Sequence, residues 1–406
     1  MNIAMVSVNA SPLAAPTGID GGQDVHVAEL ARELGAQGHH VTIYTHKSAP
    51  GLRDRVRMSP GVAVEHIQAG PTEPLPVQQL AVHTLEFGRR LAARLADERP
   101  DVIHAHSWVS GLAVTAAQRA ERETRDIPLV QSLYGLARKA GAHRRLETAL
   151  ARSANAVTTG GTPEADVLIQ NGVPRRAIHI VPDGVDVERF TPEGPAYARS
   201  EAPRLLAPSL SPPAVAATTA ALAWIPGAEF VVAGGPARED IETDPDVDRL
   251  RRLAKQAGVH DRVTFLGRVV RKDLPRLLRS ADLVVCAPPD GAADRAPLEA
   301  MACGVPVVTT PSSGQAEMVI DKVTGVHVSP GRPADMARRV RDLLGDSTLR
   351  TAYGIAAADR ARSRYSWDRI CRETLRVFDR VTDTPPAGGR GEPEPTDIEE
   401  LLASPA

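Results

Sequence analysis

Three short segments of the sequence contain residues that could take part in chemistry. Gly21 and Gly22 stand just before a helical pattern, where glycines let the backbone approach a ligand closely and the helix N-terminus favours an anion. Any tight turn between a strand and a helix can use such a pair, so the glycines alone do not define a site. They do not form the Gly-x-Gly-x-x-Gly pattern of dinucleotide-binding enzymes, which argues against a dehydrogenase.

The second segment contains two histidines at alternate positions where an apolar run ends. His104 and His106 would point to the same side of a strand, and at the carboxyl edge of a parallel sheet that side can face a ligand. A metal site is a poor interpretation because no third ligand lies at suitable spacing and zinc needs three or four. A single histidine here would be a core or capping residue, whereas the pair predicts polar contacts in a site.

The third segment places Glu299 near the start of a predicted helix that follows the apolar run 282–286. One interpretation is a carboxylate that complements the helix dipole. The other is a ligand contact, since small residues and the turn Gly304-Val-Pro306 follow it closely.

These residues need elements that hold them. The first half of the chain alternates apolar runs with helical patterns, which is typical of a parallel sheet covered by helices. Strands are predicted at 3–8, 41–45, 62–67, 102–104, 128–131, 156–159 and 178–181, with helices at 25–35, 78–98 and 111–125. A second alternation predicts strands at 204–207, 229–233, 263–266, 283–286, 307–309 and 326–328. The segment 48–60, with Arg53, Arg55 and Arg57, is expected to be a loop whose arginines face water or an anionic acceptor.

The turn-rich stretch 182–195 separates the two halves. We therefore predict an α/β protein with a first domain over 1–185 and a second over 186–364. A helix over 365–383 is expected to cross back to the first domain, and the proline-rich acidic tail 384–406 is expected to be disordered.

Composition restricts the function classes. The chain has 406 residues, a formal net charge of -2, 42% hydrophobic and 24% charged residues, so it has no general attraction for nucleic acid. It has three cysteines without a Cys-x-x-Cys pair, no apolar run long enough for a membrane span and no signal-peptide pattern. A cytoplasmic enzyme, or a relative of one, is expected, and the sequence does not indicate its oligomeric state.

Taken together, these segments resemble the family-four retaining glycosyltransferases, and the resemblance covers the chain to about residue 381. The matching segments are Gly21-Gly22-Gln-Asp-Val25, His104-Ala-His106-Ser-Trp108, Val181-Pro-Asp-Gly-Val-Asp186, Phe230-Val-Val-Ala-Gly-Gly-Pro236 and Leu298-Glu-Ala-Met-Ala-Cys-Gly-Val-Pro306. Within the family, the sequence most resembles the actinobacterial enzymes that transfer N-acetylglucosamine to inositol phosphate.

The resemblance implies two Rossmann-like domains facing across a cleft (the GT-B type) and metal-independent transfer, without a cofactor, from a nucleoside-diphosphate-sugar donor to a small-molecule or glycan acceptor. It also implies site residues. His106 would contact the transferred sugar, the backbone at Gly21 and Gly22 would approach the diphosphate, and Leu298 and Glu299 would belong to the donor site, with Glu299 on the ribose hydroxyls. No protein nucleophile is implied.

The sequence departs from the family pattern around the diphosphate. Ser209 and Ala214 stand where the family has an Arg and a Lys, and Gly291 replaces a Glu, with Asp290 adjacent. The segment after Gly70-Pro71 lacks the Lys that binds acceptor phosphate in the inositol-phosphate subgroup. Cations that could compensate are Arg268, Arg271, Lys272 and Arg295, which could equally be solvated surface residues.

Three functions therefore remain open from the sequence. The first is an active retaining glycosyltransferase with an altered diphosphate site. The second is a catalytically degenerate relative that acts as a binding or scaffolding partner. A sugar-nucleotide epimerase is the third, and it would need carboxylates and basic residues around the diphosphate that this sequence does not show.

Overall fold

The chain forms two α/β units. The structure is a computed structural model, and it describes residues 1–13, 22–135, 141–286, 295–311 and 315–383. Leaving Gly22 aside, the first unit contains 1–13, 23–182 and 367–383 of these, and the second contains the described residues of 183–366. The chain thus leaves the first unit after Pro182 and returns to it at Trp367. The predicted tail 384–406 lies outside the described residues.

The first unit is built on an eight-stranded sheet with the order β3-β4-β2-β1-β5-β6-β7-β8. Its pairs are parallel except β3 with β4, which are antiparallel. The strands are β1 (Asn2–Val6), β2 (His40–His46), β3 (Arg55–Ser59), β4 (Val62–Ile67), β5 (Val102–His106), β6 (Leu129–Leu133), β7 (Ala156–Thr159) and β8 (Ile178–Ile180).

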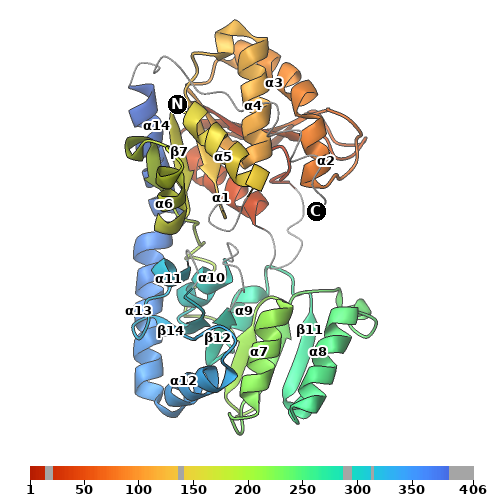
Figure 1. Cartoon of the computed structure of the whole chain (residues 1–406), viewed down its shortest axis with the longest axis vertical. Coiled ribbons are helices and arrows are strands. Elements are labelled where there is room, and N and C mark those ends of the chain that lie inside the picture. Colours follow the sequence, from red (N-terminus) through yellow and green to blue (C-terminus); the bar gives the residue numbers. More distant parts are fainter. Residues whose placement is uncertain (14–21, 136–140, 287–294, 312–314, 384–406) are drawn as a thin grey trace. The chain divides into compact units, whose positions relative to one another are not determined.

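Helices cover both faces of this sheet. One apolar cluster lies under α2, α3, α4 and α5, and another joins α1 and α14 to the opposite face; Figure 1 shows α3 and α4 side by side. The helices are α1 (Gln23–Ala36), α2 (Val77–Val82), α3 (Thr84–Glu98), α4 (Trp108–Ala120), α5 (Gly141–Ser153), α6 (Thr162–Gln170) and α14 (Trp367–Thr382). Short 3-10 turns occur at Arg122–Thr124 and Arg175–Ala177.

Two sequence predictions for this unit were wrong. Residues 48–60 were expected to be a loop, but β3 lies within them, and Arg55 pairs with Glu65 (3.2 Å) and Glu98. The strand was missed because its alternate residues are charged and exposed, as expected for an edge strand. The single helix expected over 78–98 is two helices, α2 and α3, which meet at His83.

The second unit has a six-stranded parallel sheet with the order β11-β10-β9-β12-β13-β14. Its strands are β9 (Arg204–Ala207), β10 (Glu229–Ala233), β11 (Val263–Gly267), β12 (Leu283–Cys286), β13 (Val307–Thr309) and β14 (Gly325–His327). These elements lie within two residues of the predicted ones, because each apolar run is short and bounded by turn-forming or charged residues.

Helices again cover both faces of the sheet. The cluster on one face includes residues of α7, α8 and α12, and the cluster on the other includes residues of α9, α10 and α13. The helices are α7 (Pro212–Leu222), α8 (Pro245–Gln256), α9 (Leu274–Leu278), α10 (Ala296–Ala302), α11 (Gln315–Met318), α12 (Pro333–Gly345) and α13 (Ser347–Tyr365). Short 3-10 turns occur at Arg238–Asp240 and His260–Arg262.

Local sequence explains where two of these helices, α8 and α13, begin. The Asp244 carboxylate accepts from the backbone N–H groups of Asp246 (3.0 Å) and Val247 (2.9 Å), and Pro245 occupies the first helical position of α8. Asp346 caps α13 through the Leu349 N–H (2.9 Å). Such caps satisfy N–H groups that have no partner inside the helix.

Candidate functional site

Each sheet has one place where the strand order reverses, and ligands of parallel α/β sheets bind beyond the carboxyl ends of the strands there. In the first sheet this switch point lies between β1 and β5, and in the second it lies between β9 and β12. The loops after these four strands lead into α1, α4, α7 and α10. The segments singled out in the sequence fall in or next to these connections.

At the first switch point, Gln23 holds the ends of β1 and β5 together. Its amide Nε2 donates to the carbonyl of His106 (2.9 Å) and to the hydroxyl of Ser7 (3.3 Å). Gln23 is the first residue of α1, directly after the exposed Gly22; Gly21 lies outside the described residues. The sequence contained this glutamine within the glycine motif, but its role was not predicted.

Strained backbone follows the second histidine. Ser107 has φ 79° and ψ 164°, a region that is almost confined to glycine and costs about 1–3 kcal/mol. Its hydroxyl donates to the Asn9 amide oxygen (2.9 Å), while the Ser110 hydroxyl accepts from the Val8 N–H (3.0 Å). These bonds tie the start of α4 to the loop after β1, so the strained turn is fixed on both sides.

The two predicted histidines are buried in the first unit. His104 and His106 lie on the same side of β5 with ring centroids 4.0 Å apart, and the His26 ring of α1 lies 5.7 Å from that of His106. His104 contacts the Ser132 hydroxyl through Nε2 (2.7 Å), whereas neither ring nitrogen of His106 has a hydrogen-bond partner among the described residues.

Burial keeps both histidines neutral. It lowers the pKa of His104 to about 3, with a smaller contribution from His26. Burial also lowers the pKa of His106 well below its usual range, and His104 and His26 add to the effect. The His106 side chain is therefore an uncharged donor and acceptor, suited to hydrogen bonding rather than to binding an anion by charge.

At the second switch point, Glu299 is buried in the first turn of α10 and forms an ion pair. Its carboxylate accepts from the Arg271 guanidinium at 2.7 Å, and the two side chains are 2% and 14% exposed. Arg271 also lies over the ring of the buried Phe190, with its guanidinium carbon 5.3 Å from the ring centroid. This arginine is therefore held beside the carboxylate and is not a solvated surface residue.

The other predicted donor-site residues have different environments. Arg295, which precedes α10, is buried; its guanidinium donates to the Gly184 carbonyl (3.1 Å) and lies 3.4 Å from the Asp183 carboxylate. The surface alternative is wrong for Arg295. Arg268 is exposed, and Leu298 is a fully buried core residue.

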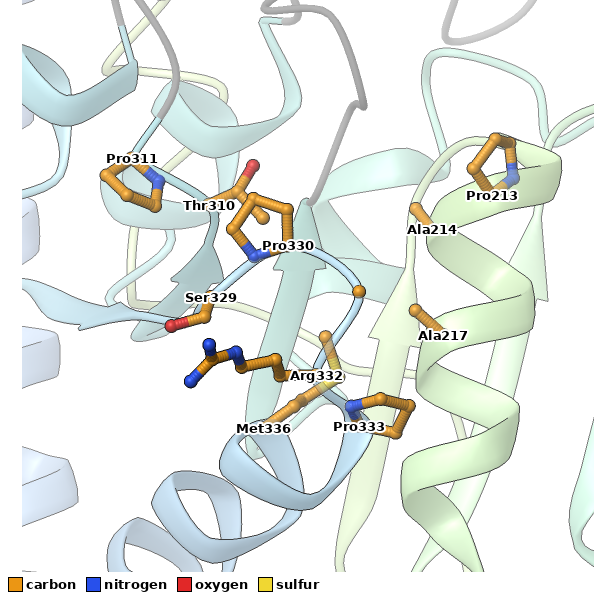
Figure 2. Close-up of a pocket in the computed structure, with 11 residues that line it drawn as sticks. Pro213, Ala214, Ala217, Thr310, Pro311, Ser329, Pro330, Arg332, Pro333 and Met336 are labelled. Atoms are coloured by element: carbon orange, nitrogen blue, oxygen red, sulfur yellow. The ribbon is translucent and has the colours of Figure 1, made fainter.

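One of the positions that lack the expected cations, Ala214, lines a small cavity. Ala214 of α7 is buried, and Ser209 is half-buried in the loop before that helix. Figure 2 shows Ala214 and Ala217 on one side of a cavity of about 150 Å³. On the other sides are Thr310, Pro311, Ser329 and Pro330, beyond the ends of β13 and β14, and Arg332, Pro333 and Met336 at the start of α12. Asp290 and Gly291 lie outside the described residues.

In the part of the chain that the structure describes, no three His, Cys, Asp or Glu side chains converge in a group that could hold a metal ion. Among the helices described, none combines the length and apolar character needed to cross a membrane.

Two family descriptions match the chain. Glycosyltransferase Family 4 matches residues 20–189, and Glycosyl transferases group 1 matches residues 216–360. A D-inositol 3-phosphate glycosyltransferase of Xylanimonas cellulosilytica is 33% identical over 418 residues, covering 95% of this chain and 98% of the relative. The protein of the same name from Salinispora tropica is 33% identical over 93% of this chain and 84% of its own.

Solved structures show the same architecture. Sucrose-phosphate synthase from Thermosynechococcus elongatus superposes with a TM-score of 0.79 at 23% identity, over 94% of this chain and 99% of that chain. Anabaena HepE in complex with UDP and glucose gives a TM-score of 0.68 at 19% identity, over 94% of this chain and all of that chain. These likenesses establish the two-domain fold of GT-B glycosyltransferases.

Proposed function

Because the chain belongs to glycosyltransferase family 4, we propose that it moves a hexose-type sugar from a nucleoside-diphosphate sugar to a small-molecule or glycan acceptor. In this proposal the transfer retains the anomeric configuration and needs neither a metal nor a cofactor, and the protein acts in the cytoplasm. The observation that carries the proposal is the buried Arg271–Glu299 pair beside the switch point of the second sheet.

We assign Glu299 to the ribose of the donor. A buried carboxylate near the carboxyl end of a parallel sheet is suited to accept hydrogen bonds from sugar hydroxyls. The Arg271 guanidinium donates to one oxygen of this carboxylate at 2.7 Å, and a carboxylate offers further acceptor positions to sugar hydroxyls. Leu298 is fully buried, so it holds α10 in place by packing in the core and does not contact the ligand.

The diphosphate needs positive charge that Ser209 and Ala214 do not provide. We assign this role to Arg271 and Arg268, with Arg295 fixing the start of α10. Arg271 already stands beside Glu299, and the exposed Arg268 follows β11 in the same unit. Each hydrogen bond from a charged group would contribute about 1.5–3 kcal/mol to the binding of the leaving diphosphate.

The transferred sugar is assigned to His106, with the backbone at Gly21 and Gly22 near the diphosphate. The buried neutral imidazole has both ring nitrogens without partners among the described residues, so it can hydrogen-bond a sugar hydroxyl. Gln23 fixes the backbone that carries this ring. His106 is therefore a contact of the transferred sugar, and no protein nucleophile is assigned.

The acceptor is less restricted than the donor. The relatives are named for D-inositol 3-phosphate, but the segment after Gly70-Pro71 has no lysine to bind a phosphate. We therefore expect an acceptor that is recognised by its hydroxyl groups, which includes unphosphorylated polyols and glycans.

Turnover of nucleotide sugars tests this function. The full chain is incubated with UDP-, GDP- and ADP-sugars and a panel of polyols, sugar phosphates and glycans, and released nucleoside diphosphate and product mass are measured. We expect one donor to give a product of retained configuration by proton NMR, with no loss of rate in EDTA. Absence of turnover with every donor would support the degenerate binding partner instead. Inversion would refute the retaining assignment.

A further inference from the structure

The first unit has a positively charged groove that the proposed transfer does not use. It is a cavity of about 570 Å³ between β8 and α14. The charged residues that line it include four arginines, two before β8 and two on α14: Arg175, Arg176, Arg376 and Arg380. Glu373 also lines the groove, but its carboxylate is paired with Arg369 at 2.6 Å.

The positive charge of the groove is local. The whole chain carries a formal net charge of -2, so four arginines around one cavity are a marked departure from the average. His179 of β8 also lines the groove, and burial lowers its pKa, with further contributions from Arg380 and Arg175. The imidazole is therefore neutral near pH 7. The two arginines that help to lower its pKa would also attract an anionic ligand in the groove. Asp379, which is also on α14, does not line the groove, and its charge acts on His39, where it opposes the lowering of the pKa by burial.

One side of the groove is the edge of the sheet. β8 is the last strand in the sheet order, and it pairs with β7 through Val157–Ile178, Thr158–His179 and Thr159–Ile180. The Ile178 carbonyl accepts from the Arg175 guanidinium at 3.0 Å. No strand follows β8 in the described sheet, so its outer edge is a surface where a further segment of chain can lie.

The groove is lined by two turns of α14 and by buried apolar side chains. Its α14 residues, from Glu373 to Arg380, are spaced by three, one and three positions on one face of the helix and span roughly 10 Å. Val377, Ile178 and Val181 line the groove and are buried, whereas Arg376 and Arg380 are exposed. This combination favours an extended ligand that carries both carboxylates and aliphatic side chains.

The chain itself contains such a segment. Residues 397–402 read Asp-Ile-Glu-Glu-Leu-Leu, so acidic and aliphatic side chains lie next to one another. They lie beyond α14, which ends at Thr382, and residues 384–396 separate them from the last described residue. That connection reaches up to roughly 40 Å, which is several times the length of the groove.

We propose that residues 397–402 of this chain bind in cis to the arginine-lined groove between β8 and α14. Charge complementarity and the apolar floor favour this occupant, and its tether gives it an effective concentration that a free peptide lacks. The proposal does not depend on glycosyl transfer, so its test needs no substrate.

Disulfide trapping in the full chain tests the proposal. Arg376→Cys with Glu400→Cys places one thiol on the groove and one on the acidic segment. The matched control is Asp379→Cys with Glu400→Cys, because Asp379 is exposed on the same helix between Arg376 and Arg380 but does not line the groove. Burial raises the pKa of Cys303 and Cys371 to about 12, and Cys286 is buried, so the native thiols should stay unreactive.

We expect the groove pair to form an intramolecular disulfide at least about tenfold faster than the control pair, because binding raises the local thiol concentration. Glu399→Lys in the same background should abolish the difference. Equal rates for the two pairs would overturn the proposal. A disulfide-linked dimer in place of the intramolecular product would assign the groove to the segment of a second copy and would refute binding in cis.

Hydrogen exchange gives an independent measurement without added cysteines. Backbone amides of β8 should exchange about tenfold faster in the Glu399→Lys/Glu400→Lys variant than in the parent, because the occupant is removed from the strand edge. Amides of β7 serve as the internal control, since they pair inside the sheet in both proteins. Unchanged exchange in β8 would contradict the proposal.

Discussion

The two switch points of this protein are built in different ways. In the first unit, neutral groups define the site: His104 and His106 are buried and uncharged, and Gln23 bonds to backbone and hydroxyl groups. In the second unit, ion pairs define it, with Arg271 on Glu299 and Arg295 near Asp183.

The difference indicates how each site responds to change. Removing a neutral partner from the first site loses a modest hydrogen bond, whereas removing one charge from the second leaves its partner buried and unpaired. The first site should therefore be sensitive to acid, which charges its histidines. The second should be sensitive to single charge deletions.

The largest effect is expected for Glu299→Ala. It leaves the Arg271 guanidinium without its carboxylate, and breaking a buried pair costs about 3–5 kcal/mol of unfolding free energy. Urea titration measures this loss, and adding Arg271→Met should recover most of it. Glu242→Ala is the control, because its exposed pair with Arg251 should contribute only about 0–1 kcal/mol. An equal loss of unfolding free energy for the two substitutions would show that the Arg271–Glu299 pair stabilises the protein no more than an exposed pair does.

Acid should destabilise the first site by protonating its buried histidines. The folded-state pKa of His104, about 3, lies below the ordinary histidine pKa of 6.5, so the unfolded chain binds the proton more strongly and stability falls as the pH drops from about 6.5 towards 3. Between pH 7 and pH 4 this histidine should account for a loss of about 3 kcal/mol. His104→Leu should reduce the pH dependence of unfolding by that amount. An unchanged dependence would show that His104 is not held neutral by burial.

A new cation at position 214 should increase the affinity of the second site for a diphosphate. Ala214→Lys places an ammonium group beside the cavity that α7 lines, and we expect nucleoside diphosphates to bind about tenfold or more tightly. Calorimetric titration measures the change, and the nucleoside without phosphates is the control ligand. An equal gain in affinity for the nucleoside diphosphate and for the nucleoside would show that the added charge does not act on the diphosphate.

The smallest effect is expected for Gln23→Ala. The substitution removes the bonds to the His106 carbonyl and the Ser7 hydroxyl, which should lower the unfolding free energy by about 1–2 kcal/mol. Gln37→Ala, just beyond the other end of α1, is the control, since the Gln37 side-chain amide forms one solvent-exposed bond, to the Glu33 carboxylate, among the described residues. A larger loss than for Glu299→Ala would reverse the ranking of the two sites.

Sequence periodicity predicted most of the two sheets because their buried strands are short apolar runs. It failed at β3, where exposed arginines alternate with half-buried residues, and at His83, where the apolar pattern continues through a break between two helices. Periodicity records which side chains are buried, so it says little about an exposed edge strand or a bend that keeps the same face inward.

The candidate site was predictable in its positions but not in its contacts. The sequence singled out His106 at the end of a predicted strand and Glu299 near the start of a predicted helix, each in a recognisable segment. It gave no signal that Arg271, 28 residues before Glu299 in the sequence, would pair with it, since this contact depends on the packing of the α9 and α10 connections. The bonds of Gln23 to Ser7 and His106 depend in the same way on three-dimensional neighbours.

Calorimetric titration of UDP, GDP and ADP into the unmodified chain is the most direct test of the claim that the second switch point binds a nucleoside diphosphate without the usual arginine and lysine. We predict saturable heat for one nucleotide, with a dissociation constant in the micromolar to millimolar range that is weakened by Arg271→Gln. No heat from any of the three, with the protein folded, would contradict the account.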